Sequence, residues 1–277
     1  MGMQRTQGFT ILETMLFLGV TGLLIIGTLV GIGASLNVQR YRDGVQSLKS
    51  LVQDQYSQTK DVVNDHNNSW KCAANAQVSQ GGANSGTERG QSNCVLLGRY
   101  MIINQSTVSI QNVVGNQVAS TTVGTDIQLL KANYVVALNS SSATTSTLEW
   151  GAKIAWPQSG TGSQPSGTAR SIGILLVQSP DSGITYTFTV DTPKDMTATS
   201  GTDLFNMMVT GNNVSQLIGS ATIRGQDQRT ICIDPSTFTG FSGTAIYLDA
   251  YATNSTAIET QTNEMLQQTQ GNGAPQC

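Results

Sequence analysis

The chain begins with a strongly apolar segment that follows a short polar stretch. Residues 1–8 carry one basic residue, Arg5, whereas residues 14–36 carry no charge. These 23 uncharged residues are enough to cross a bilayer as a helix at about 1.5 Å per residue. The pattern therefore predicts a leader peptide over residues 1–8 and a membrane-spanning helix over residues 9–36.

The helical pattern continues past the apolar segment, but there it has only one apolar face. Apolar residues recur at spacings of three and four, and charged residues such as Arg42 and Asp43 stand between them. We expect the same helix to continue as an amphipathic half over residues 37–66, packed under a globular domain. The apolar positions of this half are Val38, Tyr41, Val45, Leu48, Val52 and Tyr56.

Beyond residue 67 the spacing changes to the alternation of apolar and polar residues that is typical of β-strands. Three threonines alternate with apolar neighbours over residues 184–190, which predicts a strand with one buried face. A turn sequence, residues 179–183, joins this strand to an apolar run before it and predicts a hairpin. The other predicted strands are residues 95–103, 107–111, 127–138, 148–156, 172–177, 229–233 and 244–251.

Three polar stretches interrupt or follow the predicted strands. Residues 75–93 are rich in Gly, Asn, Ser and Gln and predict a loop, and residues 256–270 are polar and weakly helical. Residues 159–167 either separate two subdomains or form a long surface loop within one domain, and we favour the loop. We therefore expect an α+β fold. Its long N-terminal helix, with a membrane half and an amphipathic half, packs on an antiparallel, β-sheet-rich globular domain of residues 67–277.

The composition favours a globular domain that lies outside the cytoplasm. Only 11% of the residues are charged, against about 25% in ordinary soluble domains. Loss of residues 1–8 would remove one of the 14 basic residues and none of the 17 acidic ones, which leaves a formal charge of −4. The remaining basic residues are spread along the chain, so the charge does not indicate strong capture of nucleic acid.

The four cysteines predict two disulfides. The chain has no Cys-x-x-Cys pair and a single histidine, so we expect no metal site. An even number of cysteines in an exported chain favours disulfides, of which three pairings are possible. We favour Cys72 with Cys94 and Cys232 with Cys277, because each pair closes a loop at one end of the globular part. Loops of that size are worth roughly 3–4 kcal/mol.

The single carboxylate at the start of the apolar segment, Glu13, is the most informative residue of the chain. A carboxylate at membrane depth costs at least ~2.5 kcal/mol and usually has a function. If the chain is cut between Gly8 and Phe9, the new amino group of Phe9 lies about one helical turn from Glu13. Pairing of these two charges, within one subunit or between staggered neighbours, would relieve the cost and fix the register of an assembly.

The N-terminus closely resembles that of the type IV pilin and pseudopilin superfamily, through Gly8, Phe9, Glu13 as the fifth residue after the cut, and the apolar segment. The resemblance covers residues 1–65. It implies that a prepilin peptidase cleaves after Gly8 and N-methylates Phe9, and that Glu13 sets the assembly register. It also implies partners, namely other pilin subunits and an inner-membrane assembly platform. The subunit would be anchored by a single membrane span before assembly and would lie in an extracellular filament or at the cell surface afterwards.

The apolar segment departs from many major pilins because it lacks a proline. The first proline of the chain is Pro157, and glycines occur in the segment instead. Glycine lowers helix propensity by about 1 kcal/mol relative to alanine and allows helices to approach closely. These glycines serve either ordinary packing between membrane helices or a segment that extends in a filament, and we favour packing. They are Gly19, Gly22, Gly27, Gly31 and Gly33.

The sequence offers no catalytic constellation, and we expect neither enzymatic activity nor a cofactor. His66, the only histidine, stands at the expected end of the helix, and the chain has no Gly-x-Ser-x-Gly elbow or phosphate-binding loop. Asp191, Asp195 and Asp203 could ligate calcium, but they lack the spacing of a calcium loop, so we interpret them as turn residues. Sequons for N-glycosylation, a weak signal, begin at Asn67, Asn104, Asn139, Asn213 and Asn254.

We therefore expect a structural subunit of a type IV pilus or of a type II secretion-like filament. The size of the globular domain and its polar loops favour a minor pilin or a pseudopilin. One alternative is a DNA-uptake minor pilin that binds DNA through Lys194, Arg224 and Arg229. The other is a membrane-anchored surface adhesin, which would work as a monomer and would not need Glu13.

Overall fold

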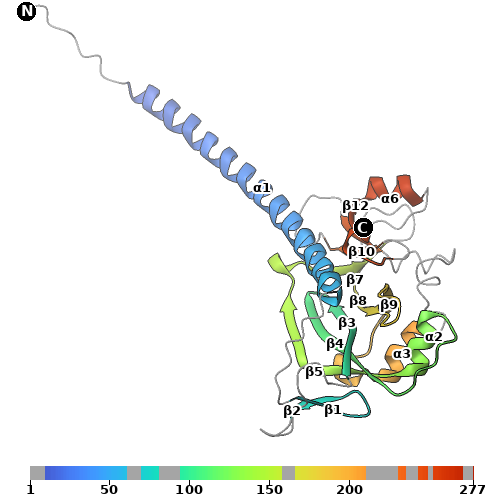
Figure 1. Ribbon diagram of the computed structural model, residues 1–277. Coiled ribbons are helices and arrows are strands. Elements are labelled where there is room, and N and C mark those ends of the chain that lie inside the picture. Colours follow the sequence, from blue (N-terminus) through green and yellow to red (C-terminus); the bar gives the residue numbers. More distant parts are fainter. Residues whose placement is uncertain are drawn as a thin grey trace, which may run out of the picture.

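The computed structural model describes residues 10–60, 70–80, 94–157, 166–209, 230–234, 243–248, 252–270 and 277. One long helix, α1 (Ile11–Lys60), packs by its second half on a globular part made of antiparallel sheets and short helices (Figure 1). The chain is therefore an α+β protein, as the sequence pattern predicts. The expected helix ends, residue 9 and residues 61–66, lie outside the described residues.

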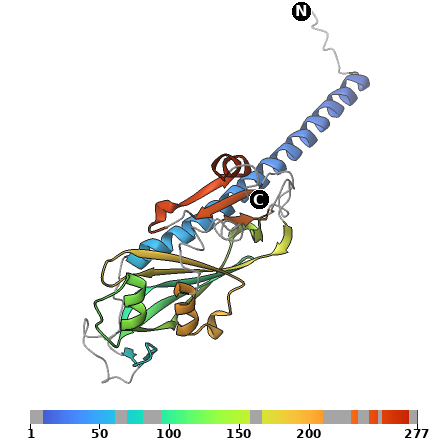
Figure 2. The same cartoon turned by 90° about the vertical axis from the view of Figure 1, so that its right-hand side faces the viewer.

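The two halves of α1 differ sharply in their surroundings. The first half projects away from the globular part (Figures 1 and 2), and every large apolar side chain from Ile11 to Leu36 is exposed. Apart from the partly buried Thr21 and Gly22, all residues of α1 up to Leu36 are exposed; Asn37 is partly buried, and Tyr41 is the first fully buried side chain. At about 1.5 Å per residue the 50-residue helix is roughly 75 Å long. The change at residue 37 coincides with the predicted boundary between the apolar and the amphipathic half.

The central sheet, as we call it, has five antiparallel strands in the order β5-β4-β3-β8-β9. Its strands β8 and β9 form the predicted hairpin across residues 179–183. Its strands are β3 (Cys94–Asn104), β4 (Thr107–Gln117), β5 (Tyr134–Thr147), β8 (Ser171–Gln178) and β9 (Thr185–Asp191).

A second antiparallel sheet, the outer sheet, has the strand order β12-β11-β10-β6-β7. It pairs segments from the middle and the end of the chain, since Cys232 in β10 lies opposite Ala155 in β6. A separate hairpin of β1 (Trp70–Cys72) and β2 (Val78–Gln80) lies at the far end of the globular part (Figure 1). The strands of the outer sheet are β6 (Ile154–Trp156), β7 (Ser166–Ala169), β10 (Thr230–Ile233), β11 (Thr244–Leu248) and β12 (Ile258–Thr262).

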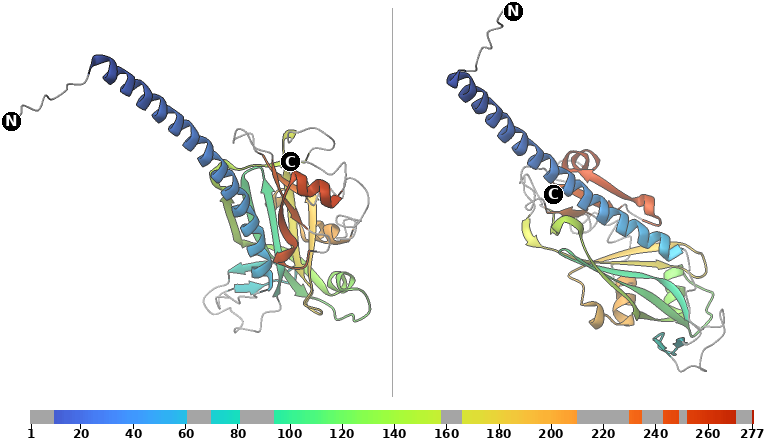
Figure 3. Two further views of the ribbon diagram at one scale, coloured as in Figure 1. Left: turned by 90° about the horizontal axis from the view of Figure 1, so that it is seen from above. Right: turned by 90° about the vertical axis from the view of Figure 1, so that its left-hand side faces the viewer.

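The second half of α1 lies between the two sheets (Figures 2 and 3). Leu48 of α1 belongs to one buried cluster with Ile174 of the central sheet and Ile246 of the outer sheet. The opposite face of the central sheet is covered by α2 (Asp126–Asn133) and α3 (Gly201–Val209), which contribute Leu130 and Leu204 to a second cluster. The globular part thus has four layers, namely the outer sheet, α1, the central sheet and the pair α2 and α3, and α1 is held on two sides.

Two tyrosines of α1 tie the helix to different sheets. The Tyr41 hydroxyl donates to the carbonyl of Ile233 at 3.3 Å and accepts from the N–H of Thr244 at 2.6 Å, both in the outer sheet. The Tyr56 hydroxyl forms a hydrogen bond with the hydroxyl of Thr187 in the central sheet at 2.7 Å. Burial raises the pKa of both phenols, so both stay neutral hydrogen-bonding groups.

Replacing Tyr56 with phenylalanine should lower the free energy of unfolding by about 1 kcal/mol, the net value of a typical buried hydrogen bond. The loss stays moderate because Thr187 still donates to the carbonyl of Ala252 at 2.6 Å. Denaturant unfolding of the full chain in detergent micelles measures the change. Tyr247→Phe, at a half-buried tyrosine of β11, is the matched control, and an equal loss in both variants would contradict the prediction.

Residues 127–133, predicted as a strand, form helix α2 instead. The Gln128 side chain accepts a hydrogen bond from the N–H of Thr125 at 3.0 Å, which matches the Thr-x-x-Gln pattern of a helix start. Asp126 in the first turn accepts from Tyr186 at 2.9 Å and from the hydroxyl of Ser182. The helix is thus capped and bound to the β8–β9 hairpin, and these contacts outweigh the strand-like composition.

Other short elements also differ from the sequence prediction. In the segment 148–156 only the last three residues form a strand, because residues 149–151 turn as the 3-10 helix η1 (Glu149–Gly151). The polar segment 256–270 contains strand β12 between η4 (Ser255–Ala257) and α6 (Asn263–Gln270). The predicted loop 75–93 contains β2, and α3 was not predicted. A further 3-10 turn is η2 (Met196–Ala198).

Candidate functional site

The apolar first half of α1 is the largest exposed apolar surface of the described chain. Among the described residues α1 is the one helix that is long and apolar enough to cross a membrane. Exposed apolar side chains surround the whole helix between Ile11 and Leu36, so no face is reserved for the globular part of the same chain. A helix that is apolar all round requires an apolar environment from outside the chain.

Glu13 lies in the first turn of α1, where its backbone N–H takes part in the helix start. The Thr10 side chain accepts a hydrogen bond from the backbone N–H of Glu13 at 3.3 Å. Thr10 and Glu13 thus form a Thr-x-x-Glu helix start, and a carboxylate in the first turn also interacts favourably with the helix dipole. Thr10 was not predicted from the sequence as a capping residue, although the Thr-x-x-Glu spacing signals it. Gly8 and Phe9, the expected cleavage pair, lie outside the described residues.

The glycines of the apolar half face open space. A Cβ atom added at Gly19, Gly22 or Gly27 would meet no atom of the described chain within 4 Å, and the same holds at Gly31 and Gly33. These glycines therefore serve no close contact within the described part of one chain. They leave room for close approach by a second helix.

Both disulfides join the pairs that the sequence analysis favours. Cys72 of β1 is bonded to Cys94 of β3, with their Cα atoms 5.6 Å apart. Cys232 of β10 is bonded to Cys277, with their Cα atoms 5.2 Å apart. The Asn263 side chain pairs with the backbone of Cys277, donating to its carbonyl at 3.2 Å and accepting from its N–H at 2.8 Å. The last residue is thereby fixed beside the outer sheet.

The acidic residues considered as calcium ligands have other partners. Asp191 accepts from Arg170 at 3.1 Å, whereas Asp203 accepts from Lys194 at 2.6 Å and from Ser200. The hydrogen bond from Lys194, together with those from Ser200, lowers the pKa of Asp203 to about 2. Asp195 stands at the start of η2. In the described part of the chain no three His, Cys, Asp or Glu residues are placed to hold a metal ion.

Of the three basic residues considered for DNA binding, one lies within the described chain. Lys194 is engaged with Asp203, while Arg224 and Arg229 lie outside the described residues. His66 and the sequons at Asn67 and Asn213 lie outside them as well.

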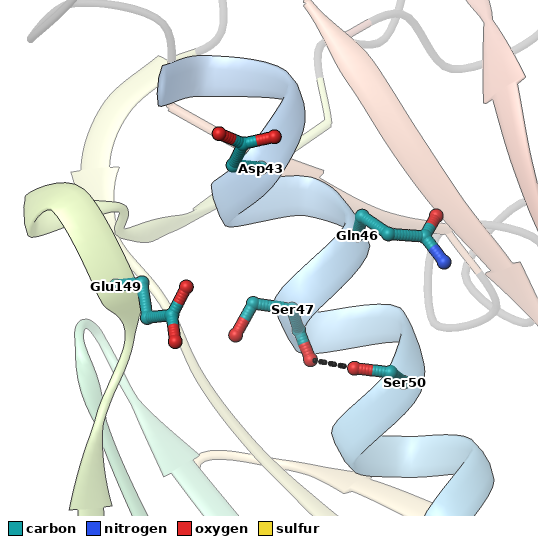
Figure 4. Close-up of a pocket in the computed structure, with 5 residues that line it drawn as sticks. All are labelled: Asp43, Gln46, Ser47, Ser50 and Glu149. Atoms are coloured by element: carbon teal, nitrogen blue, oxygen red, sulfur yellow. Dashed lines mark hydrogen bonds between the residues drawn. The ribbon is translucent and has the colours of Figure 1, made fainter. Parts of the chain in front are cut away.

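An open groove runs between α1 and η1, where the helix enters the globular part (Figure 4). The carboxylates of Asp43 and Glu149 come from its two sides, and the Ser50 hydroxyl donates to the carbonyl of Ser47 at 2.9 Å. Its five lining residues are Asp43, Gln46, Ser47, Ser50 and Glu149, a polar set without a histidine, a cysteine or a cation. This combination does not supply a nucleophile with its base.

Comparison of the chain with protein-family models, with curated proteins and with solved structures gave no match. The fold and the site therefore define the class of protein. It is an α+β protein in which one long helix is half buried between two sheets and half exposed as an apolar rod.

Proposed function

We propose that this protein is a pilin-like structural subunit, a minor pilin or pseudopilin, of a type IV pilus or a type II secretion-like filament. The subunit is cleaved between Gly8 and Phe9, N-methylated at Phe9 and held in the membrane by the first half of α1. It then enters the filament by packing this half against the same segment of other subunits. The globular part is displayed outside.

The observation that carries the proposal is the exposed apolar half of α1 with its single carboxylate. Residues 14–39 carry no charge, so Glu13 is the only charged group between Ile11 and Gln39. A plain membrane anchor gains nothing from a carboxylate there, because burial of that charge in lipid opposes insertion. A bundle of such helices does gain from it, since the charge then selects the depth at which each helix pairs with its neighbour.

The packing of the second half of α1 fits a subunit that is carried by its helix. Tyr41 and Tyr56 bind the helix to the outer and the central sheet, so the globular part cannot rotate freely about α1. The position of every α1 rod in a filament would therefore fix the position of its globular part. Such rigid coupling suits a repeating assembly.

Intact-mass measurement of the protein from its native membrane or filament fraction tests the processing step. We expect a polypeptide that starts at Phe9 and carries one added methyl group. Without reduction the mass should be lower by four hydrogens, because both cysteine pairs are bonded. A mass that includes residues 1–8, or a cut beyond Leu36, would contradict pilin processing and would favour an anchored or secreted surface domain.

A further inference from the structure

Trp150 stands out because an exposed indole is held beside the helix where the globular part begins. Its side chain is 51% exposed. It belongs to η1, which packs against α1 (Figure 4 shows its neighbour Glu149 facing the helix). The approach is close at Gly44, where a Cβ atom would lie 3.2 Å from the Cβ of Ala152 and 3.5 Å from the carbonyl oxygen of Glu149. The glycine thus lets η1 come near enough to place Trp150 beside the helix.

The backbone of Trp150 is strained. Its φ is +58° and its ψ is 19°, the left-handed region that bulky residues rarely occupy. Strain of this kind persists where the surrounding structure enforces it, and it concentrates at functional positions. Half of the Trp150 side chain is exposed, and this surface is available for a contact outside the chain.

Arg40 of α1 contacts the exposed indole of Trp150. Its guanidinium lies 5.4 Å from the centre of the Trp150 ring, within the range of a cation–π contact. Arg40 is also the first charged residue after Glu13. The pair therefore joins the indole to the point of the helix at which the uncharged run ends.

The pair lies at the depth of a membrane surface if the apolar half spans a bilayer. Twenty residues from Thr14 fill the hydrocarbon layer of about 30 Å, which then ends near Gly33. The Cα of Arg40 follows roughly 10 Å further along the axis. Side chains on a helix lean towards its N-terminus, and a long arginine can reach back to the phosphate level. Tryptophan is enriched at this interface, because its ring is apolar and its N–H is polar.

We propose that Trp150 and Arg40 form an interfacial anchor that seats the globular part on the lipid headgroups of the membrane crossed by α1. The inference rests on the proposed function, in that it requires α1 to span a membrane before assembly. Arg40 binds lipid phosphate and Trp150 inserts beside it at the level of the glycerol groups. Asp43 and Glu149, one turn further from the apolar half, favour water over lipid phosphate and limit how deeply the domain can sink.

Quenching of tryptophan emission by a headgroup-labelled lipid tests this anchor. The full chain is reconstituted in phosphatidylcholine vesicles that contain phosphatidylcholine with a nitroxide on its headgroup, and flotation of the vesicles reports insertion. Since Trp150 is one of three tryptophans, we expect the label to remove up to about a third of the total emission. Trp150→Phe should abolish this loss. Trp70→Phe is the matched control and should retain it, because β1 lies at the far end of the globular part (Figure 1).

The outcomes separate the anchor from the proposed function. If the protein floats with the vesicles but the label quenches its tryptophan emission equally with and without Trp150, the proposed anchor is wrong. Membrane insertion of α1 is then still supported. A chain that does not float overturns both. Emission of Trp150 that responds to the protein-to-lipid ratio, and not to the label, would assign the indole to a second copy of the chain and would overturn the lipid contact.

A glycine at position 150 provides a second test that does not depend on the fluorescence of that residue. Glycine adopts a positive φ without strain. If Trp150 serves the membrane contact, Trp150→Gly should leave the denaturant midpoint of unfolding equal to or above that of the unaltered protein. Limited proteolysis of the globular part in vesicles should nevertheless become faster, at least twofold, because the domain is no longer held on the surface. A lower midpoint without any change in proteolysis would mean that Trp150 serves the fold alone.

Discussion

Replacing Glu13 with alanine should leave the protein inserted in the membrane but reduce its incorporation into filaments to the background level. Insertion should even become more favourable, since a carboxylate in the hydrocarbon layer costs at least ~2.5 kcal/mol. Assembly should fail because the amino group of Phe9 would lose its partner and the helices would have no common register. Separate assays of membrane fractions and of sheared filament fractions measure the two effects.

Glutamine at the same position distinguishes the register role from the helix-capping role. Thr10 accepts from the backbone N–H of Glu13, and glutamine supports the same Thr-x-x-Glu/Gln helix start without a charge. If the charge sets the register, Glu13→Gln should fail to assemble as completely as Glu13→Ala. Normal assembly of Glu13→Gln would refute the register role of the charge.

A control on the same helix separates this effect from a general sensitivity of α1 to lost charge. Asp43 is exposed in the second half of the helix. Asp43→Ala removes a carboxylate outside the apolar segment, so it should assemble normally. A surface adhesin that works as a monomer predicts a different pattern, in which all three variants keep their function.

Replacing Arg170 with methionine should lower the free energy of unfolding by about 3–5 kcal/mol, the loss expected when one partner of a buried ion pair is removed. The Arg170 side chain is fully buried. It donates to Asp191 of β9 at 3.1 Å and to the carbonyl of Thr230 in β10 at 2.6 Å, and its guanidinium lies 4.5 Å from the centre of the Trp156 ring. Arg170 therefore bridges the central and the outer sheet.

The position of Arg170 in the chain explains why the bridge matters. It is the single residue between the end of β7 at Ala169 and the start of β8 at Ser171, where the chain passes from the outer to the central sheet. Methionine has a similar volume but would leave the Asp191 carboxylate, only 17% exposed, without its cation. Both sheets should then lose their mutual orientation along with the ion pair.

Denaturant unfolding of the full chain in detergent micelles measures the effect, with near-ultraviolet circular dichroism as the probe. Lys194→Ala is the matched control, because it removes an ion pair whose lysine is 63% exposed. Pairs of that kind contribute at most ~1 kcal/mol. Arg170→Lys should fall between the two, since lysine keeps the charge but loses the planar fork. Equal losses in the free energy of unfolding for Arg170→Met and Lys194→Ala would contradict the role of Arg170 as a bridge between the sheets.

Patterns of neighbouring residues were sufficient to predict the helix face, the β9 hairpin and the disulfide pairs. The spacing of Tyr41, Val45 and Leu48 predicted a helix face, and these residues are buried against the sheets. Alternation over residues 184–190 predicted β9 with its hairpin, but the expected solvent-exposed face was wrong, because Thr185, Thr187 and Thr189 are buried. The favoured cysteine pairing followed from the local loop that each pair closes at one end of the globular part. The signals for the hairpin and for the disulfides lie within a few tens of residues of the contacts that they predict, and the signal for the helix lies within the helix itself.

Features that depend on distant partners left little trace in the sequence. The pairing of β6 with β10 joins segments on either side of the β8–β9 hairpin, and no spacing in the sequence predicts it. Arg170 is one arginine between two strand-like runs, and only the meeting of the two sheets makes it a bridge. The left-handed backbone of Trp150 results from the turn that η1 makes against α1, which local propensity does not contain. Thr10 differs, because its Thr-x-x-Glu spacing was readable.

The packing of α1 between both sheets determines how the subunit would bear tension. A pull along the exposed rod loads the buried stretch from Tyr41 to Thr59, roughly 27 Å of helix, in shear. All contacts along this length then resist together, whereas a helix on one surface could be peeled off turn by turn. The two disulfides limit the extension that could follow, because Cys72–Cys94 and Cys232–Cys277 close the chain near both ends of the globular part. A pilin-like subunit with this structure would therefore transmit force through its helix, and its disulfides would limit the extension of the globular part.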